Sequence, residues 1–341
     1  MRSLFLTACL TALIFAPAAR AADDLPPGER AHLKLAFGLA DAVADEIWSG
    51  WGTAPRTTIL VTRPTEFMIC TDRPPEGYGP LANNPELGCP VFARANASGR
   101  LPGATFTIVG RQPTVIIAPP LRTDRAWLPW IATWAHEHFH QWQMSQPDYI
   151  EAAEALGLGG GDTSGAWMVE YPFPYDDPGV GRAFKEMTRA LDAAQSALGA
   201  ADGSAALSVY LSAKARFKRM LSPPDRRYLD FQLWQEGVAL FAEYQLAAVG
   251  AIRLGRFEVA PGYHLAGLDR YAERLRRSIL TDLRTVRLES SRRLAFYPVG
   301  AVEALVLDYI HPSWRDGYLE NKFSLDWAFE EAGLREEVRS P

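Results

Sequence analysis

The sequence predicts an α+β fold, with a small β-sheet layer on the N-terminal side followed by a mainly helical half. Two observations support this prediction. Short runs rich in β-branched residues, bounded by Pro and Gly, occur before Pro120, and we find no strong strand pattern after it. Beyond that point apolar residues recur at helical spacing almost throughout. A sheet first and helices afterwards is the order of an α+β domain.

The first 21 residues have the features of a secretory signal peptide. Arg2 precedes an apolar run at residues 4–15, and Ala19-Arg20-Ala21 is typical of a cleavage site. A lipoprotein signal is the alternative, because residues 6–9 resemble a lipobox, although the apolar run continues beyond its cysteine. We therefore expect the mature chain, residues 22–341, to be periplasmic or secreted.

The elements after the signal peptide follow from periodicity, in chain order. A helix is expected at 29–49, because its apolar residues are spaced as on one helical face. Four strands are expected, at 57–62, 66–70, 104–110 and 114–118. Six further helices are expected, at 126–145, 179–199, 204–221, 223–249, 265–288 and 298–309. We interpret this as one domain, with a sheet-containing part at 22–120 and a helical part at 121–341.

Charge and hydropathy exclude two classes of partner. Removal of residues 1–21 deletes two arginines and no acids, so the formal net charge changes from −5 to −7. A nucleic-acid partner would require a basic face, and none is expected here. No later segment approaches the roughly 18 uninterrupted apolar residues of a membrane span.

Cleavage leaves two cysteines, Cys70 and Cys89. In an oxidising compartment such a pair is more often bridged than free, so we predict a disulfide. Zinc ligation by the two thiols is the competing interpretation. It lacks support, because no second Cys/His pair with ligand spacing lies nearby.

Two loops are distinctive in composition. Residues 157–165 are glycine-rich but lack the Lys-Ser/Thr ending of a phosphate-binding loop, so we expect a mobile connection close to the functional cleft. Residues 171–178 form an aromatic, proline-rich turn. This turn either packs as a loop, lines a pocket or holds a cation.

The segment around residue 136 carries the motif His-Glu-x-x-His. On a helix, His136 and His140 point the same way, one turn apart, and two such imidazoles can bind one metal ion. Glu137 flanks them as a candidate general base. His138 lies about 200° from His136 around the helix and is expected to pack or to support a ligand. Four neighbouring aromatic residues also suit a buried core helix, and this second interpretation is compatible with the first.

A catalytic zinc ion requires a third protein ligand and an open fourth position. Glu236 is the best candidate, because a carboxylate among apolar neighbours in mid-helix is costly unless a positive group pairs with it. Gly237 is unfavourable in a helix, which suggests that another backbone or a ligand approaches closely there. Glu243, seven residues on, either orients a ligand or is a solvated helix residue.

These motifs resemble those of the gluzincin metallopeptidases, particularly the aminopeptidase N-like branch. His136-Glu137-x-x-His140 and Glu236-Gly237-x-Ala239 match two elements of that branch, with Gln235 in place of its Asn. Tyr297-Pro-Val-Gly300-Ala301 resembles its Tyr-x-x-Gly-Ala element. The resemblance implies a zincin-like fold, Zn2+ as the cofactor, and a role for Tyr297 in stabilising the oxyanion.

The chain also departs from that branch. His140 and Glu236 are 96 residues apart, much farther than in the branch, so residues 141–222 are interpreted as an insertion. The Gly-x-Met-Glu-Asn element that captures a free amino terminus is absent. Aminopeptidase activity in particular is therefore not implied.

The expected function is that of an exported zinc metallopeptidase acting on a peptide or protein substrate. His136, His140 and Glu236 would hold zinc, and Glu137 would transfer the proton. Tyr297, or failing it His264 or Tyr271, would donate to the oxyanion. Two alternatives remain: an inactive relative that binds peptides or cell-wall components, and a protein in which zinc has a purely structural role.

Overall fold

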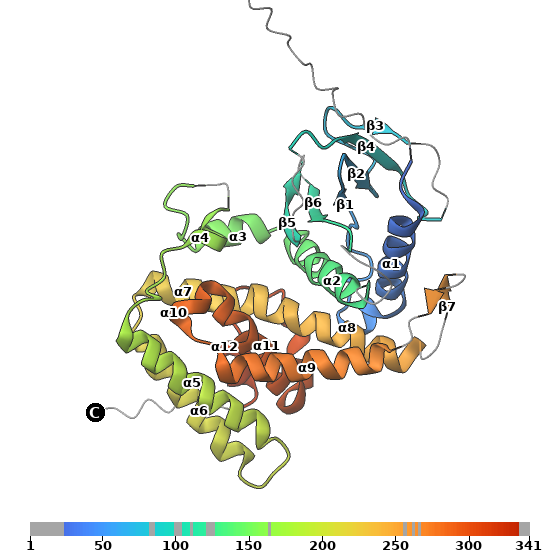
Figure 1. Cartoon of the computed structure of the whole chain (residues 1–341). Coiled ribbons are helices and arrows are strands. Elements are labelled where there is room, and N and C mark those ends of the chain that lie inside the picture. Colours follow the sequence, from blue (N-terminus) through green and yellow to red (C-terminus); the bar gives the residue numbers. More distant parts are fainter. Residues whose placement is uncertain are drawn as a thin grey trace, which may run out of the picture.

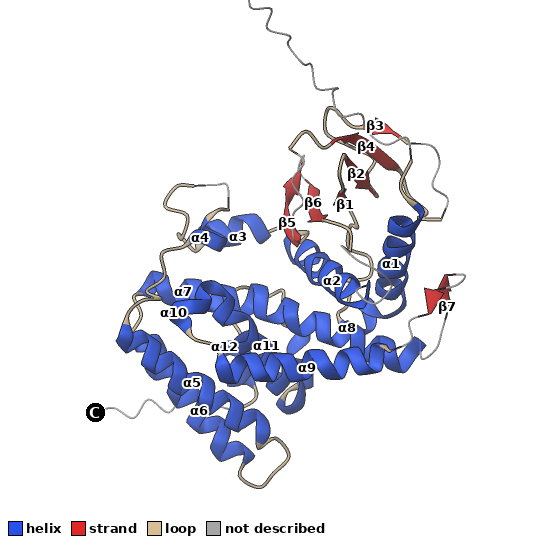
Figure 2. Ribbon diagram, viewed as in Figure 1, coloured by secondary structure: helices blue, strands red, loops and turns tan. Residues whose placement is uncertain are grey.

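The computed structural model describes residues 24–81, 86–98, 104–109, 112–120, 127–162, 165–254, 258–260, 263–264 and 267–333. The signal-peptide prediction at residues 1–21 lies outside these ranges. The strands of the main sheet gather at one end of the molecule, and helices form most of the rest (Figure 2). The α+β class predicted from the sequence is therefore confirmed.

The main sheet has the strand order β3-β4-β2-β1-β6-β5. Only the β1–β6 pair is parallel, with Thr58 opposite Val115, and the other neighbours run antiparallel. Four of the six strands correspond to the predicted ones, whereas β3 and β4 were not predicted. The strands are β1 (Thr58–Val61), β2 (Thr65–Ile69), β3 (Gly79–Pro80), β4 (Val91–Ala95), β5 (Ala104–Val109) and β6 (Gln112–Ile117).

Two helices pack beside this sheet, α1 (Pro27–Ile47) and α2 (Trp127–Met144) (Figure 1). Side chains of α2 fasten it to the strands. The indole of Trp134 donates to the Thr58 hydroxyl at 3.1 Å, and the Gln141 amide donates to the Thr57 carbonyl at 3.0 Å. Both side chains are fully buried, so these bonds fix the rotation of α2 about its axis.

The helical half contains the second long segment on which the site depends. It begins at α7 (Pro223–Gln232), where Ser222 and Asp225 form a capping box, continues through a π-helical turn, η1 (Leu233–Gly237), and ends in α8 (Val238–Leu254). The start of this helix at residue 223 was predicted, and the π-turn was not. α8 packs against α1, α2, α9 and α11.

The remaining helices complete the half. Its long ones match predicted helices to within a few residues, and the short ones were not predicted. A two-stranded hairpin, β7 (Glu258–Ala260) with β8 (Tyr263–His264), corrects the expectation that no strand follows residue 120. The helices are α3 (Tyr149–Ala155), α4 (Trp167–Glu170), α5 (Pro178–Ser196), α6 (Gly203–Arg219), α9 (Leu268–Thr285), α10 (Leu288–Ser291), η2 (Arg292–Ala295), α11 (Phe296–Ile310), η3 (Pro312–Arg315) and α12 (Asp326–Glu331).

Among the described residues, one helix is long and apolar enough to cross a membrane by length and composition. It is the continuous segment Pro223–Leu254, in which an 18-residue window has a mean hydropathy of 1.2. Its packing against four other helices is typical of the core helix of a folded domain.

An aromatic core joins the sheet side to the helical half. Trp48, at the end of α1, packs against Phe139 of α2 with ring centroids 5.2 Å apart, and against Tyr318 at 4.8 Å. Tyr318 in turn stacks on Trp234 of η1 at 4.4 Å. Because all four rings are at most 4% exposed, the two helices that carry the proposed ligands share one rigid core.

Candidate metal centre

Three potential ligand atoms converge where α2 crosses η1. His140 Nε2 lies 3.2 Å from His136 Nε2 and 3.1 Å from Glu236 Oε2, and His136 Nε2 lies 3.5 Å from the same oxygen. A regular tetrahedron with metal–ligand bonds of about 2.0–2.1 Å has edges of about 3.3 Å. The three separations bracket that value. The donor set and its spacing therefore fit one tetrahedral metal ion.

The outer nitrogen of His136 faces a carboxylate. Glu243 Oε2 lies 3.6 Å from His136 Nδ1, and the Tyr271 hydroxyl donates to the other oxygen of Glu243 at 3.4 Å. A carboxylate in this position holds the proton on Nδ1 and leaves the Nε2 lone pair toward the ligand cluster. Glu243 thus has the orienting position that was one of its two sequence interpretations.

His140 is oriented by a different chain of hydrogen bonds. Its Nδ1 lies 2.8 Å from Gln143 Oε1, which can only accept a hydrogen bond, and 3.0 Å from the amide nitrogen of Gln235. The amide nitrogen of Gln143 donates to the Tyr318 hydroxyl at 2.7 Å, and that hydroxyl donates to the Trp234 carbonyl at 2.7 Å. In the tautomer that donates its Nδ1 proton to Gln143, His140 presents the Nε2 lone pair to the cluster. Sequence reasoning identified none of these partners.

The result is two imidazole lone pairs and one carboxylate facing one another. Such an arrangement is repulsive unless a cation or a proton lies among the three groups. Burial opposes protonation of His136, but Glu236 and Glu243 outweigh it and raise its pKa to about 10. Burial would likewise raise the pKa of Glu236, but the two imidazoles hold it well below its ordinary value. The carboxylates thus stabilise a positive charge on His136, and the imidazoles stabilise the negative charge on Glu236.

The local backbone explains how Glu236 reaches the imidazoles. It lies in the π-turn, and π-turns recur at functional sites because one extra residue re-aims a side chain. The next residue, Gly237, touches α11. A Cβ built on Gly237 would lie 2.4 Å from the Gly300 Cα, so the predicted close backbone approach occurs.

Glu137 is not part of the ligand cluster. Its side chain is 9% exposed, and burial raises its pKa, which the two imidazoles counteract. A buried carboxylate with a raised pKa beside the proposed ligands is suited to accept and return a proton.

Tyr297 lies beside His136. The two rings are parallel to within 4°, with centroids 6.1 Å apart. Burial and the Glu236 carboxylate raise the pKa of the phenol above its ordinary value, whereas Arg293 opposes this rise. The hydroxyl is therefore neutral at physiological pH and able to donate a hydrogen bond.

The alternative oxyanion donors have other positions. Tyr271 donates to Glu243, the carboxylate that faces the outer nitrogen of His136, and so its hydroxyl is already engaged. The side chain of His264 lies outside the part of the chain that is described. His138 stacks on Trp134 at 4.7 Å, and burial lowers its pKa to about 3. It is a neutral packing residue, as one of its two interpretations held.

The structure describes the aromatic turn in full and the glycine-rich loop in part. In the aromatic turn, Phe173 packs on Phe296, the residue before Tyr297, with ring centroids 5.2 Å apart. Loop packing, rather than a cation site, is therefore the interpretation that the contacts support. Residues 163–164 of the glycine-rich loop lie outside the described ranges.

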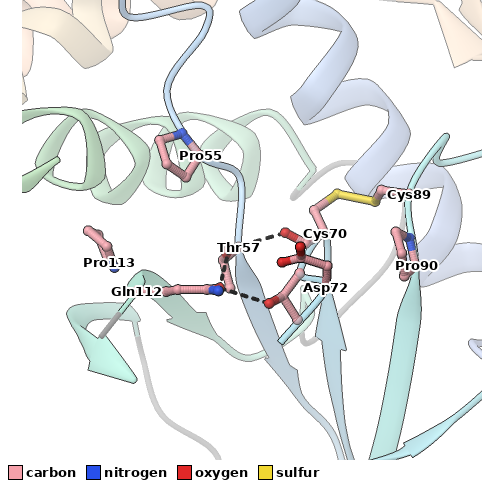
Figure 3. Close-up of a pocket in the computed structure, with 9 residues that line it drawn as sticks. Pro55, Thr57, Cys70, Asp72, Cys89, Pro90, Gln112 and Pro113 are labelled. Carbon is pink, nitrogen blue, oxygen red and sulfur yellow. Dashed lines mark hydrogen bonds between the residues drawn. A yellow bond between two sulfur atoms is a disulfide. The ribbon is translucent and has the colours of Figure 1, made fainter. Parts of the chain in front are cut away.

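A separate cavity of about 440 Å³ lies at one end of the sheet (Figure 3). The Cys70–Cys89 disulfide, with its Cα atoms 5.0 Å apart, lines one wall, as the predicted pairing requires. On another wall, Gln112 Oε1 accepts from the hydroxyls of Thr71 at 2.8 Å and Thr57 at 3.3 Å. The residues that line this cavity include neither His136 nor His140 nor Glu236.

No family model matches the sequence, and neither the curated proteins nor the solved structures contain a match.

Proposed function

We propose that this protein is an exported zinc-dependent hydrolase that cleaves peptide bonds, with a zincin-like fold of the gluzincin type. One observation carries the proposal: His136, His140 and Glu236 converge at tetrahedral spacing. A buried carboxylate, Glu137, directly follows His136 in the sequence and interacts electrostatically with both imidazoles.

Zinc is the metal that this donor set favours. Two imidazoles and one carboxylate are the ligands of catalytic zinc in metallopeptidases, whereas calcium and magnesium prefer oxygen ligands alone. When bound there, zinc supplies Lewis-acid polarisation of a carbonyl and lowers the pKa of water. A structural zinc site would be closed by a fourth protein ligand, and the described residues place only three potential ligands in this group.

The chain's own residues divide the remaining work. Glu137 removes a proton from the attacking water and returns it to the leaving amine, a role that its raised pKa suits. Tyr297 donates its hydroxyl proton to the oxygen that becomes negative in the tetrahedral transition state. Glu243 and Gln143 keep both imidazoles in the tautomer that binds metal.

Export is part of the same proposal. The Cys70–Cys89 disulfide is compatible with an extracellular or periplasmic location, since such bonds are rare in the cytosol. The N-terminal sequence supports a signal peptide at residues 1–21.

The insertion at 141–222 contributes the α5–α6 pair, which packs away from the sheet (Figure 1).

The test is hydrolysis of a generic protein substrate, such as casein, by the purified mature chain. Activity should disappear with a zinc chelator and return with added zinc. Glu137→Gln should lower turnover by a factor of about 100 to 10,000, the usual contribution of a positioned acid–base group. A protein that binds zinc yet cleaves neither casein nor a peptide library would instead be a binding protein.

A further inference from the structure

One charged residue beside the cluster has no role in the function proposed above. Arg293 lies in η2, four residues before Tyr297, and its side chain is 28% exposed. One of its nitrogens, Nη1, lies 2.6 Å from the Tyr297 hydroxyl oxygen and 3.5 Å from Glu236 Oε1. The same nitrogen therefore contacts the proposed oxyanion donor and the proposed third ligand.

We propose that Arg293 is a positioning residue that frees and aims the hydroxyl proton of Tyr297. The inference rests on the proposed hydrolysis and adds a residue to it. A phenol oxygen carries one proton and accepts through its lone pairs. Because the guanidinium donates to this oxygen, the phenol proton points elsewhere and remains available for another acceptor.

The competing acceptor for that proton is Glu236. The Tyr297 hydroxyl also interacts directly with this carboxylate, and a donor beside a carboxylate is normally captured by it. Arg293 already provides Glu236 Oε1 with a positive partner at 3.5 Å. The guanidinium thus reduces the competition of the ligand carboxylate for the phenol proton.

Arg293 makes a second contact with Tyr297. The guanidinium also lies over the Tyr297 ring, 5.7 Å from the centroid, and so restrains the ring as well as the hydroxyl.

Arg292 is a natural control because it precedes Arg293 and differs in its contacts. It pairs with Asp176 at 2.7 Å and lies over the ring of Tyr175, and both members of the ion pair are more than half exposed. Arg292→Met removes a charge from the same turn without touching Tyr297 or Glu236.

The experiment is a double-mutant cycle with Arg293→Met, Tyr297→Phe and the double variant, each loaded with zinc. Two quantities are measured, kcat and the Kd of a phosphinic analogue of a peptide that the wild type cleaves. The phosphinic group carries the tetrahedral oxyanion that Tyr297 is proposed to contact. Zinc content is determined for every variant, so that loss of the metal is distinguished from a change in the orientation of the Tyr297 hydroxyl.

Tyr297→Phe should lower kcat by roughly 10²–10³, the scale of one oxyanion donor. Arg293→Met should lower kcat and weaken phosphinic binding by roughly 10- to 100-fold, the scale of one charge-assisted hydrogen bond. In the Tyr297→Phe background, Arg293→Met should add almost nothing. Arg293→Lys should restore part of the loss, and Arg292→Met should match the wild type.

Independent, additive effects of the two substitutions would overturn the proposal, because Arg293 would then act without Tyr297. So would a loss confined to KM for substrates that carry a carboxylate, which would make Arg293 a substrate-binding residue. A wild type that cleaves no peptide refutes the proposed function first, and this inference falls with it. A wild type that depends on Glu137 but shows an additive cycle refutes the inference alone.

Discussion

Gly237 and Gly300 bring the backbones of η1 and α11 into direct contact. A Cβ built on Gly300 would lie 2.4 Å from the Leu233 carbonyl oxygen and 2.8 Å from the Gly237 Cα. Because Gly237 follows Glu236 and Gly300 lies three residues after Tyr297, this contact sets the distance between the proposed third ligand and the proposed oxyanion donor.

Gly300→Ala should therefore disturb the site as well as the packing. The added methyl group must separate two backbones, so we expect a loss of about 1–3 kcal/mol in the free energy of unfolding. Zinc affinity should fall as well, because Glu236 shifts with η1. Urea unfolding and zinc titration measure the two effects.

Gly181→Ala is the matched control. This glycine lies in α5, and a Cβ built on it meets nothing within 4 Å. The substitution should raise stability by roughly 0.5–1 kcal/mol, since alanine is the better helix former, and leave zinc affinity unchanged. A Gly300→Ala variant as stable and as zinc-avid as the wild type would show that the close crossing is not needed.

Glu243→Gln should weaken zinc binding without removing a ligand. The carboxylate lies 3.6 Å from His136 Nδ1 and holds the imidazole in its binding tautomer. Losing such a partner typically reduces metal affinity by about 10- to 100-fold. Competition with a chromophoric chelator measures the change. Tyr271→Phe should have a smaller effect in the same direction, and Glu46→Gln on the surface none; equal affinities throughout would assign Glu243 to solvation alone.

Reduction of the disulfide should lower stability while leaving the metal site intact. Cys70 and Cys89 are separated by 19 residues, and closing a loop of that size contributes about 3 kcal/mol. Cys70→Ser/Cys89→Ser should lose about that amount in urea unfolding and keep its zinc. Titration of the denatured, unreduced protein should find no free thiol. Two reactive thiols would contradict the pairing.

Asp230 gives the folded state a pH dependence that one variant can isolate. Burial raises its pKa to about 6, although Lys218, 2.7 Å away, and Lys214 counteract the rise, and Asp326 is a further negative charge nearby. The unfolded value is about 3.9, so between about pH 4 and 6 the folded chain binds a proton that the unfolded chain releases. This contribution to stability is fully present at the acidic end and is lost as the pH rises to 6.

Asp230→Asn cannot titrate and therefore lacks this contribution. Its stability relative to the wild type should rise from pH 4 to pH 6 and then level off. Urea unfolding at pH 4, 5, 6 and 7 provides the comparison. A stability difference independent of pH would show that Asp230 has the same pKa in both states.

The proposed ligands could be predicted from the sequence because these residue types, at these spacings, have few other chemical roles. The i,i+4 histidines required a common helix face, and a buried carboxylate in an apolar helix required a positive partner, so His136, His140 and Glu236 could be proposed together. Gly237 implied a close neighbour, but only the three-dimensional structure identifies it as Gly300. The separation of 63 residues between them leaves no local pattern.

Three other features, namely the π-turn, the contacts of Arg293 and strand β4, have no sequence pattern that distinguishes them from an ordinary helix or loop. The π-turn at Glu236 adds one residue to a turn, which is too small a change to alter an apolar period. Arg293 resembles any solvated arginine before a helix until its contacts with Tyr297 and Glu236 are seen. Strand β4 is only five residues long and includes an arginine, and its pairing with β2 decides its conformation.

The zinc content of three purified proteins tests the central claim most directly. The wild type and Glu137→Gln should each bind about one zinc ion per chain, because Glu137 is proposed to transfer protons and not to bind metal. Glu236→Ala should lose zinc under the same dialysis, because it removes the third ligand at 3.1 Å from His140 Nε2. If Glu236→Ala retains zinc as tightly as the wild type, the proposed metal centre is wrong, and Glu243 becomes the next candidate for the third ligand.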